Sequence, residues 1–358
     1  MSNSARERIE MLVDPNSFVE IGGLVTKRNT DFNMQEKAVP ADGVITGYGV
    51  VDNNLVYVYS QDVTALSGSV GEMHARKIAN LYEMAIKAGA PVIGLIDCAG
   101  IRVQEAFDAL AGFGQIYMAK VKAAGIIPQI SAILGSCGGG VAISSKLSDI
   151  TLMDASNGKL FVNSPNAILG NREEKCDTSN AAFQAQAGNV DIVCQDENEV
   201  IAKLRQLISM LPANAGVTAE EDCSDDLNRT LDGFDGYASD ARAALTQIAD
   251  QTEFIELKAE NGPEMVIGLM KLNGQTVGAI ANDKEGVLST AGCKKAEQFV
   301  YFCDSFGIPV VTLTNVKEYA SSMEEEKTIA QAVADMTFAF ANADVPKINV
   351  ITGQAYGS

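Results

Sequence analysis

Three consecutive glycines, Gly138, Gly139 and Gly140, stand between a predicted buried strand at 129–135 and a predicted helix at 140–147. Glycine lets the backbone approach a ligand closely, and the first amides of a helix have no acceptor within that helix. Amides at such a turn can bind a phosphate, or the oxyanion of an enolate or tetrahedral intermediate. Close packing of the helix against the strand explains the same glycines, so both interpretations stay open at this point.

A second turn is predicted where the neighbouring strand ends, in the sequence DCAGIRVQE at 97–105. Ala99 and Gly100 permit a sharp turn that would direct the amide of Ile101 toward the glycine turn. Ligands of open α/β sheets bind at such carboxyl ends of strands. Arg102 either binds a ligand anion or forms an ion pair with Glu105 or another carboxylate.

A third candidate is the Gly/Ser-rich loop that contains Ser67, Gly68 and Ser69 and enters a predicted helix carrying Arg76 and Lys77. The loop and its two cations are suited to a nucleotide phosphate. The alternative is a capped helix with a solvated basic turn. The loop lacks the Gly-Lys-Ser or Gly-Lys-Thr ending of a Walker A motif, which argues against nucleotide triphosphate hydrolysis.

The composition excludes several classes of site. His74 is the single histidine, and the seven cysteines are far apart with no Cys-x-x-Cys pair. Neither a zinc cluster nor a Ser-His or Cys-His nucleophile therefore has its parts, and no metal is predicted. The net charge of −19 argues against nucleic acid or an anionic membrane as a general partner. An anionic small molecule needs only a few local cations and remains compatible with this charge.

No apolar run approaches the roughly 18 residues of a membrane-spanning helix, and the start of the sequence has no signal-peptide pattern. These two observations predict a cytoplasmic protein.

The turns belong to a predicted unit made of a hairpin at 44–59, a helix at 71–88, a strand at 91–97, a helix at 105–124 and a strand at 129–135. Helices that alternate with buried strands predict a parallel α/β sheet. The unit recurs, because PQISAILGSCGGG at 128–140 returns 218 positions later as PKINVITGQAYGS at 346–358. A repeat of this length predicts a duplicated domain, 1–226 and 227–358. Because the sequence stops at the second turn, we expect the second domain to be incomplete and turnover to be poor.

Several long motifs, taken together and in order, resemble the carboxyltransferase family of biotin-dependent enzymes, which includes propionyl-CoA carboxylase β subunits, methylmalonyl-CoA decarboxylase α subunits and transcarboxylase. These motifs are Arg8–Ile21, Ala41–Gly49, Ser67–Glu72, Arg102–Glu105, Ile127–Ile130, Gly274–Asn282 and Phe299–Pro309. The resemblance implies two tandem crotonase-like domains of the ββαβ superhelix type, the first binding acyl-CoA and the second facing biotin. It also implies a homo-oligomer whose active site lies between domains of different subunits.

The activity implied by the resemblance is carboxyl transfer between biotin on a separate carrier and the α-carbon of a small acyl-CoA. Such chemistry relies on binding geometry and amide dipoles and requires no side-chain base. The implied partners are a biotin carboxyl carrier protein and biotin carboxylase or membrane decarboxylase subunits. Two alternatives stay open: a crotonase-type hydratase or isomerase with Glu105 as its carboxylate, and a non-catalytic acyl-CoA-binding or assembly subunit.

Position by position, the resemblance implies three groups of site residues. Ile101 stands where the family usually has alanine, and its added bulk favours a small acyl chain. In the second domain Lys317-Glu318-Tyr319 replaces the usual Pro-Gly-Phe. The implied thioester oxyanion donors are the amides of Ile101, Gly139 and Gly140; the biotin side has Glu318, Tyr319, Gly357 and Ser358; the CoA side has Ser67, Gly68, Ser69, Arg76, Lys77, Ala99, Gly100 and Gly138.

Overall fold

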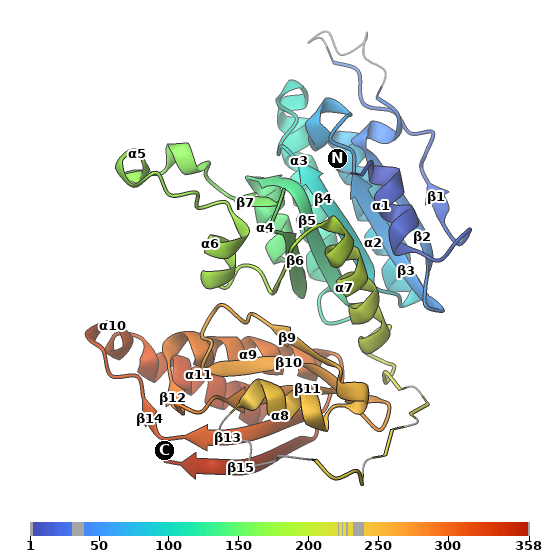
Figure 1. Cartoon of the computed structure of the whole chain (residues 1–358). Helices are drawn as coiled ribbons and strands as arrows, with labels where there is room; N and C mark the ends of the chain where they lie inside the picture. Colours follow the sequence, from blue (N-terminus) through green and yellow to red (C-terminus); the bar gives the residue numbers. More distant parts are fainter. Residues whose placement is uncertain are drawn as a thin grey trace. The chain divides into compact units, whose positions relative to one another are not determined.

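The computed structural model describes residues 3–30, 39–220, 222–223, 225–226, 228–231 and 240–356, except the side chain of Arg172. The chain forms two compact units, Met1–Ser209 and Met210–Ser358 (Figure 1). Both are mixed α/β, as the alternation of helices and buried strands predicts. Every helix within the described ranges is too short or too polar to cross a membrane.

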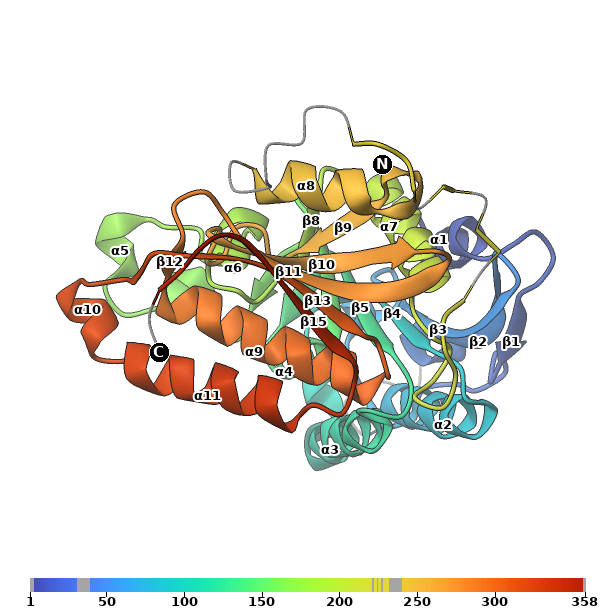
Figure 2. The same cartoon turned by 90° about the horizontal axis from the view of Figure 1, so that it is seen from below.

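The first unit is built on an eight-stranded sheet in the order β1-β2-β3-β4-β5-β6-β8, with β7 paired to β5. Figure 2 shows α2 and α3 on one face of this sheet and α1 and α7 on the other. Its elements are α1 (Ala5–Leu12), β1 (Val19–Ile21), η1 (Ala41–Gly43), β2 (Val44–Val51), β3 (Asn54–Gln61), η2 (Leu66–Gly68), α2 (Glu72–Ala88), β4 (Val92–Cys98), η3 (Val103–Glu105), α3 (Ala106–Ala123), β5 (Gln129–Gly138), α4 (Gly140–Lys146), β6 (Ile150–Asp154), β7 (Lys159–Phe161), η4 (Pro165–Ala167), α5 (Asn171–Glu174), α6 (Ala181–Gln186), β8 (Ile192–Cys194) and α7 (Glu197–Met210).

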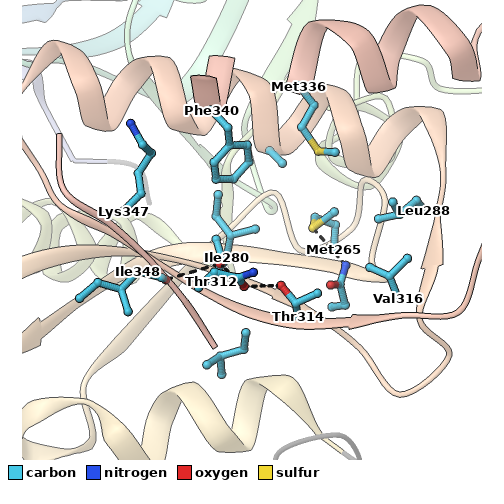
Figure 3. A pocket seen from close by; sticks show the side chains of 14 residues that line it. Met265, Ile280, Leu288, Thr312, Thr314, Val316, Met336, Phe340, Lys347 and Ile348 are labelled. Carbon is cyan, nitrogen blue, oxygen red and sulfur yellow. Dashed lines mark hydrogen bonds between the residues drawn. The ribbon is translucent and has the colours of Figure 1, made fainter. Parts of the chain in front are cut away.

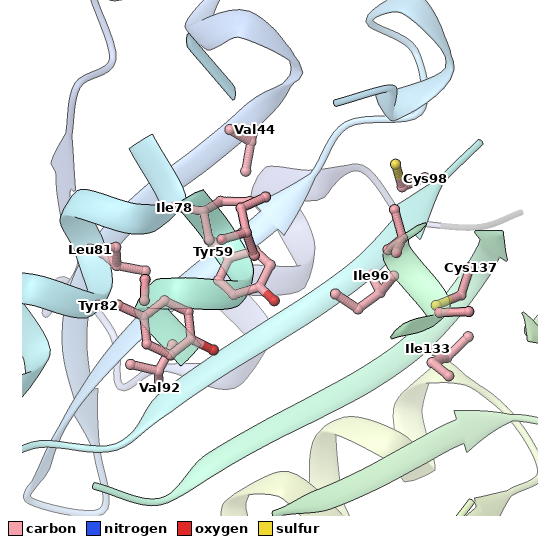
Figure 4. Close-up of a cluster of buried hydrophobic side chains, with 14 of the residues drawn as sticks. Val44, Tyr59, Ile78, Leu81, Tyr82, Val92, Ile96, Cys98, Ile133 and Cys137 are labelled. Atoms are coloured by element: carbon pink, nitrogen blue, oxygen red, sulfur yellow. The ribbon is translucent and has the colours of Figure 1, made fainter. Parts of the chain in front are cut away.

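The core of this unit lies between the central strands and the helices α2 and α3. All residues of β4 are buried, as expected for a parallel strand that is covered on both faces. Tyr59, Ile78, Tyr82, Ile96 and Ile133 pack together in this layer (Figure 4). This packing fixes β4 and β5 side by side, so that the turns after them open at the same edge of the sheet.

The second unit has a five-stranded sheet in the order β15-β13-β11-β10-β9 and a small sheet of β12 and β14. In Figure 2, α9 and α11 lie side by side on one face of the larger sheet and α8 lies on the other. Its elements are α8 (Ala241–Ile248), η5 (Asp250–Thr252), β9 (Phe254–Leu257), β10 (Met265–Leu272), β11 (Gln275–Asn282), β12 (Val287–Leu288), α9 (Thr290–Ser305), β13 (Val310–Val316), β14 (Glu318–Tyr319), α10 (Met323–Glu326), α11 (Ile329–Asn342) and β15 (Lys347–Ala355).

The structure confirms the internal repeat down to the pairing of individual strands. In the first unit β4 and β5 pair from Val92↔Gln129, and 218 positions later β13 and β15 pair from Val310↔Lys347. Both pairs carry a register shift just before their last partners. The hydrogen bond from the amide of Ser136 to Asp97 (3.2 Å) also returns, from the amide of Gln354 to Asn315 (3.1 Å).

The two units divide at the end of α7 rather than at the predicted boundary, 226/227. The reason is that the segment after α7 is already bonded to β11. Thr276 donates through its hydroxyl to the carbonyl of Met210 (2.6 Å) and through its amide to the carbonyl of Ala219 (3.1 Å). The assignment of acyl-CoA to the first part and biotin to the second stays a prediction.

Candidate functional site at the ends of β4 and β5

The turn after β4 presents an amide that has no acceptor among the described residues. Val70 donates to the carbonyl of Gly100 (2.9 Å) and accepts from the amide of Arg102 (2.9 Å), which forms an isolated parallel bridge between Val70 and Ile101. In an extended chain alternate residues direct their amides to opposite sides. The amide of Ile101 therefore points away from Val70, and none of the described residues accepts a hydrogen bond from it. Ile101 as a residue is 39% exposed.

In the glycine turn after β5, the sequence predicts that the amides of Gly139 and Gly140 are both available to a ligand. Among the described residues, only that of Gly140 lacks an acceptor. The amide of Gly139 donates to the carbonyl of Phe161 in β7 (2.9 Å), which argues against its predicted role as an oxyanion donor. Gly139 has φ 60°, which explains why glycine stands there. The amide of Gly140 has no acceptor among the described residues, while its carbonyl accepts from the hydroxyl of Tyr117 (2.8 Å). Gly138 serves close packing, because a Cβ there would lie 2.9 Å from the ring of Phe161.

The two turns lie next to each other. Cys98 and Cys137, the last paired residues of β4 and β5, are partners in the sheet. A Cβ added to Gly100 would lie 3.5 Å from the carbonyl oxygen of Gly138. Ile101 and Gly140 thus flank one edge of the sheet, as the sequence predicts, and their unpartnered amides form the candidate oxyanion site.

The loop at 67–69 supports the turn after β4. The amide of Ala99 donates to the carbonyl of Ser67 (3.0 Å), and Gly68 lies directly against the carbonyl of Asp97. Ser69 is buried, and its hydroxyl donates to the carbonyl of Leu66 (2.7 Å). Ser67 and Ala99 are exposed, so together with Ile101 they can face a ligand from this loop and turn.

The two cations of α2 differ in their surroundings. Lys77 is buried and donates to the carbonyls of Ala41 (2.8 Å) and Val44, which argues against its predicted role in binding a phosphate. Burial lowers the pKa of Lys77 to about 8. Arg76 is exposed and pairs with Glu72 one turn earlier (2.9 Å), so it is still able to meet an anion.

Arg102 forms buried ion pairs within the protein rather than facing a ligand. Its Nη1 forms ion pairs with Asp42 and with Glu105 (2.9 Å), and all three side chains are fully buried. Nη2 donates to the carbonyl of Ser69 (2.7 Å). The ion-pair interpretation of Arg102 is therefore confirmed. Glu105 also accepts from the amide of Glu72 (2.6 Å), which argues against the hydratase alternative because the buried carboxylate is engaged within the fold.

His74 is held neutral by its neighbours. Its Nδ1 lies 3.0 Å from the carbonyl of Asp42, and its Nε2 lies 3.2 Å from Nε2 of Gln61. Gln61 uses its oxygen to accept from the amide of Asp97 (3.3 Å), so its amide nitrogen faces the ring and Nε2 of His74 must accept. Burial, with a smaller contribution from Arg102, lowers the pKa of His74 to about 3. The sequence analysis did not identify Asp42 and Gln61 as residues that support the site, because their hydrogen-bond partners His74, Asp97 and Arg102 are distant in sequence.

The second unit repeats the turn that follows β4, but Ala320 stands at the position of the buried Arg102. Leu288 pairs with Tyr319, and the amide of Ala320 donates to the carbonyl of Leu288 (2.9 Å), as Arg102 does to Val70. The same alternation directs the amide of Tyr319 away from β12. Glu318 is exposed and its amide lies 3.4 Å from the carbonyl of Gly286. Gly357 and Ser358 lie outside the described residues.

A cavity of about 270 Å³ lies between the larger sheet of the second unit and its helices α9 and α11 (Figure 3). Its polar floor is formed by Thr312 and Thr314, which donate to the side-chain oxygen of Asn349 (2.8 and 2.6 Å). The same layer of the first unit is a packed core. Ile280 lines this cavity where the first unit has the larger Tyr59. The apolar lining residues are Met265, Ile280, Leu288, Ala296, Leu313, Val316, Met336, Phe340 and Ile348.

Comparison with known proteins agrees with this architecture. The carboxyl transferase domain model matches residues 2–358. The chain is 35% identical to the propionyl-CoA carboxylase beta chain of Roseobacter denitrificans, over 99% of this chain and 72% of that one. It is 36% identical to the methylmalonyl-CoA decarboxylase subunit alpha of Veillonella parvula, over 99% of this chain and 73% of that one.

Among solved structures, transcarboxylase 12S with methylmalonyl-coenzyme A bound superposes with a TM-score of 0.92 at 33% identity, covering 98% of this chain and 71% of that one. The predicted tandem crotonase-like fold and the predicted relationship are thus confirmed. The chain belongs to the carboxyl transferase domain family.

Proposed function

We propose that this chain transfers a carboxyl group between biotin on a separate carrier and the α-carbon of a small acyl-CoA. The observation that carries this proposal is the pair of amides of Ile101 and Gly140, at the adjacent ends of β4 and β5, for which no described residue is an acceptor. The named relatives support the substrate class, because both are enzymes of propionyl-CoA or methylmalonyl-CoA.

The two amides would bind the thioester oxygen of the acyl-CoA. That oxygen gains negative charge when the α-carbon loses a proton or a carboxyl group and the enolate forms. Preorganised donors at this place stabilise the enolate without having to reorient, and one such donor is worth about 3 to 4 kcal/mol. The exposed side chain of Ile101 stands beside the same site and would favour a short acyl chain.

The CoA side consists of exposed loop residues and one cation. Ser67 and Ala99 are exposed on the loop and turn that lead to the candidate oxyanion site. Gly68, Ser69, Gly100 and Gly138 shape these loops by close packing. We retain Arg76 for an anionic group of CoA and leave Lys77 out, because its ammonium is bonded to carbonyls.

One described position supports the proposal that the second unit faces biotin. The amide of Tyr319 occupies the place of Ile101 in the repeat and is directed away from β12, so it can donate to a ureido oxygen. Biotin, when bound, would supply or accept the carboxyl group. Glu318 flanks this amide. Gly357 and Ser358, which lie outside the described residues, are retained as proposed biotin-side residues. A carrier protein and a homo-oligomer are the proposed partners; the related transcarboxylase 12S forms a hexamer.

A non-catalytic acyl-CoA-binding subunit is the second candidate. The observation that favours it is the amide of Glu318, which already faces the carbonyl of Gly286 at 3.4 Å and is therefore not free on the biotin side.

The test is incubation of the full chain with methylmalonyl-CoA or malonyl-CoA, with and without free biotin, and quantification of the acyl-CoA products by mass spectrometry. We expect decarboxylation that depends on biotin. Binding of acyl-CoA without turnover in either condition would instead favour the non-catalytic subunit. Hydration of an enoyl-CoA in a parallel incubation would overturn the proposal in favour of a hydratase.

A further inference from the structure

One buried residue holds the Ile101 turn through both its main chain and its side chain. Arg102 directly follows Ile101, and its amide donates to the carbonyl of Val70 (2.9 Å). Its guanidinium donates to the carbonyl of Ser69 (2.7 Å), the residue before Val70. Arg102 therefore holds both Ser69 and Val70, the two residues that lie opposite the Ile101 turn.

Two buried carboxylates fix the direction of that guanidinium. Asp42 and Glu105 both pair with Nη1 of Arg102, and all three side chains are fully buried. Each carboxylate is anchored separately on α2, Asp42 by the amide of His74 (2.7 Å) and Glu105 by the amide of Glu72 (2.6 Å). Arg102 thus has one orientation in which its donors are satisfied.

The internal repeat shows that the turn can form without the buried arginine. In the second unit, Ala320 stands 218 positions after Arg102, and Pro263 matches Asp42 because Val44↔Gln61 and Met265↔Asn282 are equivalent strand pairs. The contact of Glu105 has a counterpart, since Glu325 accepts from the amide of Thr290 (2.7 Å), 218 positions after Glu72. The bridge itself is preserved there, with Leu288 opposite Tyr319. Buried ion clusters are weak contributors to stability, since desolvation opposes the attraction between the charges. Arg102 and its two ion pairs are therefore an addition to the first unit rather than a requirement of the turn.

We propose that Arg102, Asp42 and Glu105 are positioning residues that fix the direction of the Ile101 amide toward the thioester oxygen. This inference rests on the proposed function. The cluster does not touch the substrate. It acts by preventing the bridge between Val70 and Ile101 from shifting, so that the donor is already aligned when charge develops on the oxygen.

The test uses Arg102→Lys, which keeps the charge but loses the planar fork of donors, and Glu105→Gln, which keeps an acceptor but loses the charge. Glu105→Gln is the milder change, so kcat and the carbonyl frequency can still be measured on this variant if Arg102→Lys does not fold. Lys120→Met is the matched control, because Lys120 is equally buried in the same unit, where it donates to Tyr82 (3.0 Å) and Ser148 (2.7 Å). The measurements are kcat, KM, Tm and the infrared carbonyl frequency of bound propionyl-CoA labelled with ¹³C at the thioester carbon.

We expect kcat of both cluster variants to fall about 10- to 100-fold while KM changes less than about twofold, because alignment rather than affinity is lost. The bound carbonyl should move back toward its frequency in water. Lys120→Met should lower Tm and leave kcat and the carbonyl frequency unchanged. Cluster variants that lower Tm but keep kcat and the carbonyl frequency would overturn the positioning role.

The two proposals fail in distinguishable ways. If the unchanged chain shifts the carbonyl frequency but never decarboxylates, the proposed carboxyl transfer is contradicted, and the carbonyl frequencies of the variants still decide the positioning role. If the unchanged chain binds propionyl-CoA without shifting its carbonyl frequency, no oxyanion donor acts on the thioester and the positioning role is overturned as well.

Discussion

Replacing Gly140 by proline removes a donor that the proposed mechanism needs. Gly140 is the first residue of α4, and no described residue accepts from its amide. Proline is well tolerated at the first position of a helix, where its missing N–H would have no helical acceptor. The substitution therefore deletes a candidate oxyanion donor without deleting a hydrogen bond of the fold.

The size of the effect follows from the chemistry of the donor. Loss of one oxyanion donor lowers kcat by about 10² to 10³, or about 2.7 to 4 kcal/mol. A steric contribution comes in addition, because a Cβ at Gly140 would lie 2.9 Å from Phe113 Cε1 and from the hydroxyl of Tyr117. Gly140→Ala introduces the same Cβ and keeps the amide. The ratio of kcat between the alanine and proline variants therefore isolates the donor.

The assay is biotin-dependent decarboxylation of methylmalonyl-CoA, with Tm measured for both variants. We expect the alanine variant to turn over at least about 100 times faster than the proline variant at similar Tm. A ratio below about threefold, with both variants folded, would refute the assignment of the Gly140 amide as an oxyanion donor.

Three further predictions concern acyl specificity, acid stability and helix packing. Ile101→Ala keeps the amide and removes bulk beside the acyl group, so kcat/KM for ethylmalonyl-CoA relative to methylmalonyl-CoA should rise about 10-fold or more; an unchanged ratio would show that this side chain does not border the acyl chain. His74 has a pKa of about 3 in the folded protein, below its ordinary value, so the unfolded chain binds its proton first and stability is lost as the pH falls below about 6.5. The free energy of unfolding should fall by about 2 kcal/mol between pH 7 and pH 5 from this group, and urea titrations of His74→Gln should lack that part. On α3, Gly112→Ala should destabilise by about 1 to 3 kcal/mol, because its Cβ would lie 2.8 Å from that of Ala75 on α2. Gly114→Ala, which has open space around its Cβ, should stabilise by about 0.5 to 1 kcal/mol in the same titration.

The order and kind of the main elements could be predicted from the sequence because the signals are local. The apolar spacing of α2 and the glycine that follows it, Gly89 with φ 65°, mark a helix and its end without any tertiary information. The duplication was also readable, since glycine, proline and apolar positions return in register. The neighbouring turns after β4 and β5 follow from parallel pairing of two consecutive buried strands.

The tertiary structure decides whether each polar group bonds within the protein or is available to a ligand. Gly139 and Gly140 are indistinguishable in sequence. Yet β7 supplies a carbonyl to the amide of Gly139, while no residue in the described ranges accepts from the amide of Gly140. Lys77 looks like a basic residue at the start of a helix, but carbonyls from an earlier segment surround its ammonium. A donor is free or engaged according to what the fold brings within about 3 Å of it.

The sequence by itself therefore determined the family, the duplicated α/β units and the two turns that could bind an acyl-CoA. Only the tertiary structure decided that Ile101 and Gly140 present the unpartnered amides, that Arg102 serves a buried cluster with Asp42, and that the second unit contains a cavity where the first has a packed core. The physical reason is that periodicity and turn residues act along the chain. Hydrogen-bond satisfaction and burial depend on partners that are distant in sequence.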